Sequence, residues 1–346
     1  MERDSLYSRS IAISGLPEFI ESLGGSPEKL FAQAGLNLAD VYGDENFISW
    51  NGTCRLLELA ARELDEPSFG IKWAHSMPKS YQNTGPMLFL GSLVADMQEF
   101  FDLAFKYQKI HTNGVRYVML ENKAEGWLEG QLHVHPNSVP CRQYAEHIVA
   151  VSVLMEKHHL GEAKLKQIRF QHSAPADQRW HKLTFPCPVI FNADVTAGRM
   201  ELEFLHQAVN GKLKYLQPLL KLHLNRRMKK TPDRHSSIVS LVQELLPAIL
   251  GVNNSGITRV ADMMEISSKK LQRLLKEEGV TYSEVIDGVR QGMSRRLLFE
   301  SAIPIARIAL LLDYSTGEAY NAACKRWTGM SPRSYRQHLR AQIAAE

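Results

Sequence analysis

The most constraining feature of the sequence is a helix–turn–helix pattern that occurs twice in its last third. In residues 257–278 a short apolar helix pattern leads to Ser267, a preferred N-cap, and then to a second helix with leucines on one side. Residues 304–327 repeat this organisation, with a turn at residues 313–315. One such helix alone is equally typical of an exposed, salt-bridged surface helix. The repetition favours an all-α domain with two helix–turn–helix units.

The free faces of the two second helices carry polar side chains that suit contact with DNA. In the first unit these are Lys269, Gln272, Arg273 and Lys276, and in the second they are Glu318, Asn321 and Lys325, beside the outward but apolar Ala322. Arginine pairs with guanine and glutamine with adenine in the major groove. Residues 282–302 predict a joining helix of about 20 residues, roughly 30 Å long at ~1.5 Å per residue. This length is close to one turn of B-DNA, ~34 Å, so the two units can meet successive major-groove segments.

The distribution of charge points to the same part of the chain. Residues 226–346 hold 19 Lys and Arg against 12 Asp and Glu, a net charge of +7, while residues 1–225 hold 22 basic and 25 acidic residues, a net of −3. Such asymmetry is compatible with a nucleic-acid contact and also with chance variation. The charge alone therefore leaves both interpretations open.

The first two thirds of the chain predict an α+β domain with a modest sheet. The predicted helices lie at 15–35 (a pair), 51–65, 97–111, 141–161 and 199–224, and the predicted strands at 115–120, 127–135, 166–173 and 188–192. The first two strands flank a short polar turn and predict a hairpin. The polar, basic segment interrupted by Pro232 predicts a linker. The expected division is therefore a sensing or dimerisation domain at 1–224, a linker at 225–236 and a DNA-binding domain at 237–346.

Candidate pocket residues in the first domain are aromatic or histidine side chains. They are Trp50, Trp73, Tyr81, Tyr107, His133 and His135. Each aromatic residue is also typical of plain core packing. His133 and His135 are two residues apart on a predicted strand, so both point to the same face. No cysteine or carboxylate partner lies at ligand spacing, so no metal is expected. The chain has no Walker loop, GxGxxG, GxSxG or HExxH motif, and neither a catalytic residue nor a cofactor is expected.

The expected compartment is the cytoplasm. The four cysteines are far apart in the sequence and form neither a CxxC motif nor a dense disulfide framework. No run approaches the ~20 apolar residues of a membrane span, and the charged first ten residues do not resemble a signal peptide. We therefore expect no membrane association.

The stretch 257–340 resembles the DNA-binding domain of the AraC/XylS family of bacterial transcription regulators. The matching motifs are VADMMEISSKKLQRLLKEEG, an arginine, serine and double leucine within 290–298, PIARIALLLDYS, and KRWTGMSPRSYR at 325–336. Four residues depart from the usual pattern: Asp313 replaces glycine, Tyr320 and Cys324 replace phenylalanine, and Ser294 replaces alanine. Since the second unit offers few positive donors, we expect the first unit to read bases and the second to contact mainly the backbone.

The resemblance implies roles for individual residues. Base-contacting roles fall on Lys269, Gln272 and Arg273, and also on Glu318 and Asn321; phosphate-contacting roles fall on Lys276, Lys325 and Arg326. Phosphate contacts supply affinity and salt dependence, whereas base contacts supply sequence choice.

The N-terminal part is similar to the arabinose-binding-like effector domain of an AraC subgroup. The resemblance rests on LPEFIESLGGSPEKLFAQAGL, ELDEPSFGIKW and HSAPADQRWH with FPCPVIFN, and covers about 15–215. That subgroup includes regulators of ornithine and arginine use and of virulence or quorum-linked genes. The resemblance implies effector sensing, dimerisation or both.

The sequence thus predicts a homodimeric, effector-responsive transcription activator that binds double-stranded promoter DNA and contacts RNA polymerase. One alternative is a regulator whose N-terminal domain binds a protein partner or only dimerises. A second is an enzyme with a DNA-binding tail, such as a DNA-repair alkyltransferase. The second is disfavoured because Pro186–Cys187–Pro188 lacks the PCHR-like nucleophile motif and no zinc-holding cysteine cluster is present. The effector, the operator and the sign of regulation are not determined by the sequence.

Overall fold

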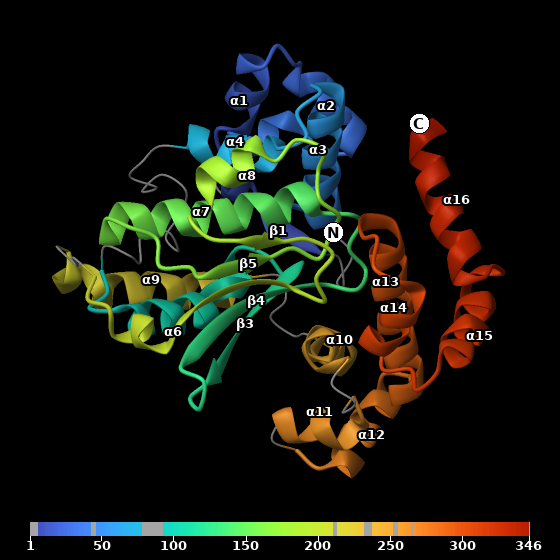
Figure 1. The fold of residues 1–346 in the computed structure, drawn as a ribbon. Helices are drawn as coiled ribbons and strands as arrows, with labels where there is room; N and C mark the ends of the chain where they lie inside the picture. The colour runs from blue at the N-terminus through green and yellow to red at the C-terminus, as the bar shows by residue number, and fades with distance from the viewer. Residues whose placement is uncertain are drawn as a thin grey trace.

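A computed structural model describes residues 6–42, 46–77, 93–209, 213–231, 237–251, 255–264 and 266–345. Figure 1 shows an α+β part built around one sheet and an all-helical part beside and below it. This arrangement confirms the predicted fold class. Among the described helices, none is long and apolar enough to cross a membrane.

The chain begins with a small helical layer, which is drawn in blue at the top of Figure 1. Its helices are α1 (Leu16–Ser22), α2 (Pro27–Ala34), α3 (Trp50–Glu63) and α4 (Phe69–Ser76), and a two-stranded antiparallel pair joins β1 (Tyr7–Arg9) to β2 (Phe47–Ser49). Ser26 caps α2 by accepting a hydrogen bond from the Lys29 amide at 3.3 Å. Gly35 ends the same helix in the left-handed conformation that glycine adopts without strain.

A five-stranded sheet follows, with the strand order β3-β4-β7-β5-β6. The strands are β3 (Val115–Asn122), β4 (Trp127–Val134), β5 (Gln167–Arg169), β6 (Val189–Ile190) and β7 (Thr196–Glu201). β3 and β4 form the predicted antiparallel hairpin. β7 lies at the centre of the sheet and pairs with β4 and β5, so the prediction that helix begins at 199 is wrong. Its sequence, TAGRME, has little β-branched character and therefore a low local tendency to form a strand. The strand forms because it pairs with β4 and β5.

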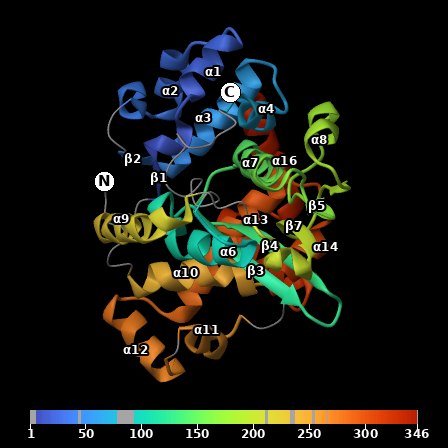
Figure 2. The same cartoon turned by 90° about the vertical axis from the view of Figure 1, so that its left-hand side faces the viewer.

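Helices α6 (Met97–Tyr107), α7 (Arg142–Leu160), α8 (Arg179–Thr184) and α9 (Gln217–Lys230) surround the sheet. Figures 1 and 2 show α7 crossing over the sheet, and α6 and α9 lie below α7. Gly161 ends α7 with a φ of 82°, as predicted. α9 continues through Lys230, so the first part of the predicted linker is helical.

The C-terminal part is entirely helical in its described residues. Its helices are α10 (Ile238–Ile249), α11 (Ile257–Met263), α12 (Ser268–Glu277), α13 (Tyr282–Glu300), α14 (Ile305–Leu311), α15 (Gly317–Thr328) and α16 (Pro332–Ala345). The pairs α11–α12 and α14–α15 form the two predicted helix–turn–helix units. The joining helix α13 starts with a capping box between Thr281 and Glu284. Apolar side chains of α10 to α16 share one core that includes Val289 and Leu297 of α13.

Candidate nucleic-acid interface

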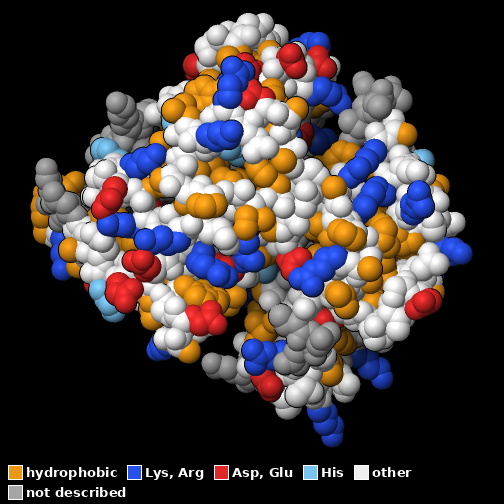
Figure 3. All heavy atoms as spheres, viewed as in Figure 1, with side chains coloured by type: hydrophobic (Ala, Val, Ile, Leu, Met, Phe, Trp, Pro, Cys, Tyr) orange, Lys and Arg blue, Asp and Glu red, His pale blue; other side chains and the backbone are white. Residues whose placement is uncertain are grey.

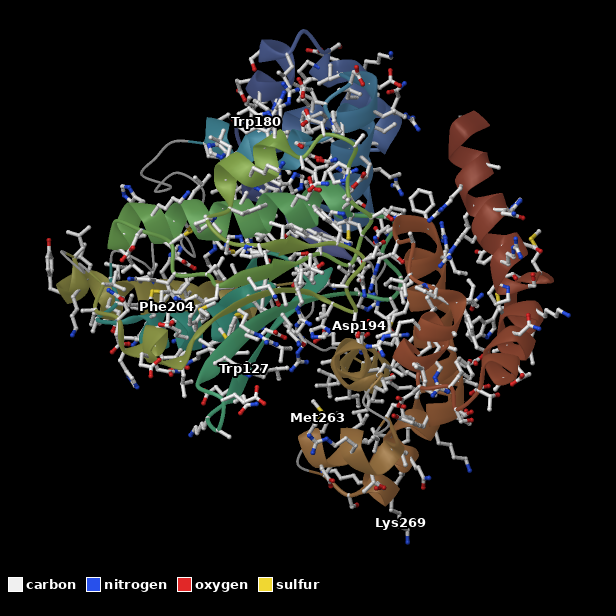
Figure 4. All side chains as sticks on the ribbon, in the orientation of Figure 1. Trp127, Trp180, Asp194, Phe204, Met263 and Lys269 are labelled. Carbon is white, nitrogen blue, oxygen red and sulfur yellow. The ribbon has the colours of Figure 1, made fainter. Side chains whose placement is uncertain are left out.

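The first helix–turn–helix unit presents one face of α12 to solvent. Ser267 caps α12 by accepting a hydrogen bond from the Lys270 amide at 3.2 Å. Leu271 and Leu275 are fully buried and fix the rotation of the helix. The opposite face is therefore free, and it carries the exposed side chains of Lys269, Gln272, Arg273 and Lys276. Figure 4 shows Lys269 at the lower tip of the molecule, pointing away from every other element.

Arg273 is engaged in a surface ion pair. Its Nη1 donates to Oε1 of Glu277 at 2.6 Å, one turn along α12. Both side chains are more than half exposed. Such a pair contributes little to stability, so the guanidinium can exchange Glu277 for a DNA acceptor at small cost.

The second unit presents a less basic face. Thr316 caps α15 by accepting from the Ala319 amide at 3.2 Å. Glu318 and Lys325 are exposed, whereas Asn321 is half-buried. Arg326 is held by Asp287 of α13, with Nη2 donating to Oδ1 at 2.6 Å. A phosphate contact by Arg326 would have to replace this pair.

Asp313 occupies the turn of the second unit in the left-handed conformation, with a φ of 58°. This conformation explains why glycine is usual at the position, and aspartate is among the few other residues that tolerate it. Its carboxylate accepts hydrogen bonds from the amides of Gly251 and Ser255, each at 3.1 Å. Asp313 thus ties the turn to the segment that follows α10, a contact that glycine could not make.

Two further departures from the usual pattern compensate for each other. Ser294 of α13 and Tyr320 of α15 are both fully buried, and their hydroxyl groups share a hydrogen bond of 2.7 Å. With the family's usual alanine at position 294 and phenylalanine at position 320, this contact would contain no polar side-chain atom. The extra hydroxyls therefore form a matched pair that joins the second recognition helix to the joining helix.

Replacing Ser294 by alanine is expected to destabilise the C-terminal domain by about 1–3 kcal/mol, because the buried Tyr320 hydroxyl would lose its partner. Adding Tyr320→Phe to Ser294→Ala should recover most of that loss, since both polar groups are then removed. Urea unfolding of the two single variants and the double variant measures the coupling. Strictly additive losses would contradict the pairing.

Basic side chains dominate the visible surface of the C-terminal part. In Figure 3, Lys and Arg outnumber Asp and Glu over the region where Figure 1 places α14 to α16, and a further basic side chain projects at the lower tip. The excess positive charge counted in the last third of the sequence therefore lies on the exterior of the C-terminal part. A surface of this sign attracts the phosphate backbone.

The aromatic residues predicted to line an effector pocket are mostly core residues. Trp50 is fully buried, donates to Ser138 Oγ at 2.8 Å and packs edge-on against Tyr144. Trp73 is buried and stacks on His147 at 3.9 Å between ring centroids. Both rings fill the interior of the domain, and their role as pocket residues stays a prediction. Tyr107 is also buried, and its hydroxyl donates to Asn225 at 2.9 Å. Tyr81 lies outside the described residues.

His133 and His135 line a cavity of about 280 Å³ between the hairpin and α10. Leu241, Glu244 and Pro247 of α10 contribute its other wall. Burial lowers the pKa of His133 to about 4, and the charge of Arg116 acts in the same direction. The ring is therefore neutral near pH 7 and lies where the N-terminal domain meets the C-terminal domain.

A second cavity, of about 260 Å³, lies between α6 and α7. Its walls are mainly apolar and include Met97, Phe100, Phe101, Ala104 and Phe105 of α6, and Ile148, Val151 and Met155 of α7. The sequence interpretation missed these residues. They recur at helical spacing on both helices, and the same spacing is typical of ordinary core packing.

The two domains are joined by buried polar contacts at α13. Arg296 is 4% exposed, and its Nη1 donates to the backbone oxygen of Val134 at 3.2 Å. Glu300 accepts from the Cys141 amide at 2.7 Å. Arg307 of α14 pairs with Asp194, which Figure 4 shows facing these helices. The helix that links the two units therefore rests directly on the N-terminal domain.

Comparison with known proteins agrees with this architecture. Residues 24–209 match the arabinose-binding domain of AraC transcription regulators, N-terminal, and residues 260–338 match the helix-turn-helix domain family. The chain is 22% identical over 345 residues to the HTH-type transcriptional regulator VirS of Mycobacterium tuberculosis, covering 98% of both chains. It is 26% identical over 168 residues to the ornithine utilization regulator of Pseudomonas aeruginosa, covering 49% of this chain and 44% of that one.

Among solved structures, the transcriptional regulator CdpR from Pseudomonas aeruginosa is similar over 80% of this chain and 91% of its own, with 21% identity and a TM-score of 0.36. These relatives are transcription regulators, not enzymes. From the matched domains and the two helix–turn–helix units, the chain belongs to the AraC family of DNA-binding transcription regulators.

Proposed function

We propose that this regulator activates transcription in response to a small molecule, reading DNA with both recognition helices. The observation that carries the proposal is the face of α12. Leu271 and Leu275 are buried, while Lys269, Gln272 and Arg273 project into solvent from the tip of the domain. A helix held in this way fits the major groove with its polar face toward base edges.

The second recognition helix has a supporting role in this proposal. The 19 residues of α13 span about 28 Å at ~1.5 Å per residue, close to one turn of B-DNA. Glu318 and Asn321 are assigned weaker base contacts, and Lys325 and Arg326 phosphate contacts. Because Glu318 is acidic and Asn321 is half-buried, the first unit supplies most of the sequence choice in this proposal.

The proposed effector binds the N-terminal domain and shifts the population of DNA-competent molecules. The cavity between α6 and α7 supports a small-molecule effector over a domain that only dimerises or binds a protein. The contacts of Arg296 and Glu300 give a route by which that domain can influence α13. In this proposal the protein acts as a homodimer in the cytoplasm, on promoter DNA and with RNA polymerase.

The direct test is a gel-shift titration of the full-length protein on a fragment carrying its own promoter, with an unrelated fragment of equal length for comparison. The expected result is tighter binding to the promoter fragment and a fall in affinity as salt rises. Equal affinity for both fragments at every salt concentration would refute sequence-specific recognition.

The variant Arg273→Ala is expected to cost about 1–3 kcal/mol at one base pair and to relax the choice of base there. Lys276→Ala is the matched control on the same helix. It should weaken binding to all sequences evenly and reduce the salt slope by about 1. Binding to a set of single-base operator variants separates the two outcomes. An even loss across all bases in Arg273→Ala would assign that residue to the phosphate backbone.

A further inference from the structure

We propose that the cavity between α6 and α7 binds an elongated, apolar and uncharged molecule with a hydrogen-bonding group near one end. This inference rests on the proposed function, because it assigns the chemical class of the effector.

The shape of the cavity follows from the positions of its lining residues. On α7 these run from Tyr144 to Leu160, a span of 16 residues and about 24 Å at ~1.5 Å per residue. On α6 they run from Met97 to the end of the helix. A volume of about 260 Å³ distributed along such a span is a channel, which fits an extended chain better than a compact ring.

The lining determines the polarity of the ligand. Methionine and phenylalanine provide much of the wall through Met77, Met97, Met155, Phe100, Phe101 and Phe105. These side chains adapt to apolar ligands. No lysine or arginine lines the cavity among the described residues. An amino acid would lack a cation for its carboxylate, and a sugar would place many of its hydroxyls against methionine, phenylalanine and other apolar side chains, so both classes fit poorly.

Polar side chains occur along the cavity, among them Gln108, Thr112 and Tyr117, and Glu156 and His159 lie toward the C-terminal end of α7. Glu156 and His159 lie three residues apart on the same helix face. The Nε2 atom of His159 is buried and has no hydrogen-bond partner among the described residues. A hydroxyl or carbonyl group on the ligand can supply that partner. Burial lowers the pKa of His159, so the ring is neutral when it does so.

Glu156 disfavours an anionic ligand. Its Oε2 accepts a hydrogen bond from the Lys164 amide at 3.0 Å, and among the described residues no lysine or arginine side chain pairs with it. Burial raises the pKa of Glu156 to about 7, so a substantial fraction is ionised near neutral pH. A fatty-acid carboxylate at this end of the channel would meet a like charge, whereas an alcohol or ketone would not.

The test uses the full-length protein and the uncharged fluorophore N-phenyl-1-naphthylamine. Saturable binding with enhanced fluorescence is expected, followed by displacement with 1-decanol. L-arabinose and L-ornithine should not displace the probe, and decanoate should compete at least about tenfold more weakly than 1-decanol, a difference of about 1.4 kcal/mol. Displacement by the sugar or the amino acid instead of the alcohol would overturn the assignment.

Two variants locate the site. Ala104→Phe fills the channel and should weaken probe binding about tenfold or more, whereas Ala32→Phe, an exposed position on α2, should leave it unchanged. Glu156→Gln should strengthen decanoate binding about tenfold with little effect on the probe. Unchanged probe binding in Ala104→Phe would overturn the proposal. So would unchanged decanoate affinity in Glu156→Gln.

The same samples are tested for promoter binding, which separates this inference from the proposed function. No saturable probe binding in a protein that still binds its promoter refutes the cavity assignment and leaves DNA recognition intact. Probe and 1-decanol binding without any change in promoter affinity supports the site but refutes its role as the effector site. Absence of specific promoter binding refutes the proposed function whatever the probe does.

Discussion

Replacing Gly292 by leucine is expected to separate the DNA-binding domain from the N-terminal domain. Gly292 lies on α13, where an added Cβ would be 2.2 Å from the backbone oxygen of Pro136. Backbone atoms cannot yield as a flexible side chain does, so the two surfaces must move apart. Overpacking of this kind destabilises the docked arrangement of the two domains by about 1–3 kcal/mol. The loss of stability is larger when the buried contacts of Arg296 and Glu300 are broken as well.

Small-angle X-ray scattering measures this effect as an increase in the radius of gyration. Gly288→Leu is the matched control, because Gly288 lies one turn earlier on α13 and nothing lies within 4 Å of an added Cβ. Circular dichroism should show unchanged helix content in both variants. Equal radii for the two variants would contradict a tightly docked interface. If the interface transmits the effector signal, Gly292→Leu should also bind promoter DNA independently of ligand.

The helix–turn–helix units could be predicted from sequence because their determinants are local. Ser267 caps α12, and the leucines of that helix recur at helical spacing, so the exposed face follows from the pattern alone. The coupling of Ser294 with Tyr320 could not be predicted in the same way. In the sequence, each residue is a separate departure from the family's usual pattern. Only the crossing of α13 and α15 brings the two hydroxyl groups together.

The N-terminal domain shows where local patterns are insufficient. The hairpin of β3 and β4 was predicted from alternation and a turn, whereas β7 was missed. Its side chains contact residues of the strands on both sides. Glu129 of β4, for example, pairs with Arg169 of β5 at 2.5 Å and with Arg199 of β7 at 3.0 Å. These three residues come from three different strands. Their proximity is a property of the sheet order and has no counterpart in sequence spacing.

The cavity between α6 and α7 illustrates a further limit. Trp50 and Trp73 are predicted from the sequence as pocket residues, yet both are buried and complete the core. The cavity is bordered by helix stripes whose composition resembles a core stripe. Periodicity identifies the buried side of a helix, but it does not show whether another side chain or an empty space faces that side.

A buried carboxylate connects α7 to α8, and its removal should have the largest effect on stability. Glu146 of α7 is fully buried, and its Oε1 lies 3.1 Å from Nε2 of His181 and 3.1 Å from Nε of Arg142. His172 approaches the same oxygen at 3.5 Å. Glu146→Leu would leave these groups without their shared acceptor, so a loss of about 3–5 kcal/mol in the free energy of unfolding is expected.

The pH dependence of this loss has a defined sign. Burial alone would raise the pKa of Glu146, but the hydrogen bond with His181 and the charge of Arg142 outweigh it, so the pKa lies below its usual range. A carboxylate with a lowered pKa stabilises the fold fully above its unfolded pKa of about 4.3, and this contribution is lost as the pH falls through the folded value. The part of the difference between wild type and Glu146→Leu that the Glu146 carboxylate itself contributes should therefore be lost below about pH 4.3.

Urea unfolding followed by tryptophan fluorescence at pH 7.5, 5.5 and 4.0 measures this difference. Glu63→Leu is the control, because Glu63 lies at the surface of α3 and pairs with the exposed Lys29 at 3.3 Å. Its effect should stay within about 1 kcal/mol at each pH. A gap between wild type and Glu146→Leu that widens on acidification would mean that Glu146 is protonated in the folded protein. The carboxylate would then hold His181 and Arg142 as a neutral hydrogen-bonding group, and the ionic account of this cluster would fail.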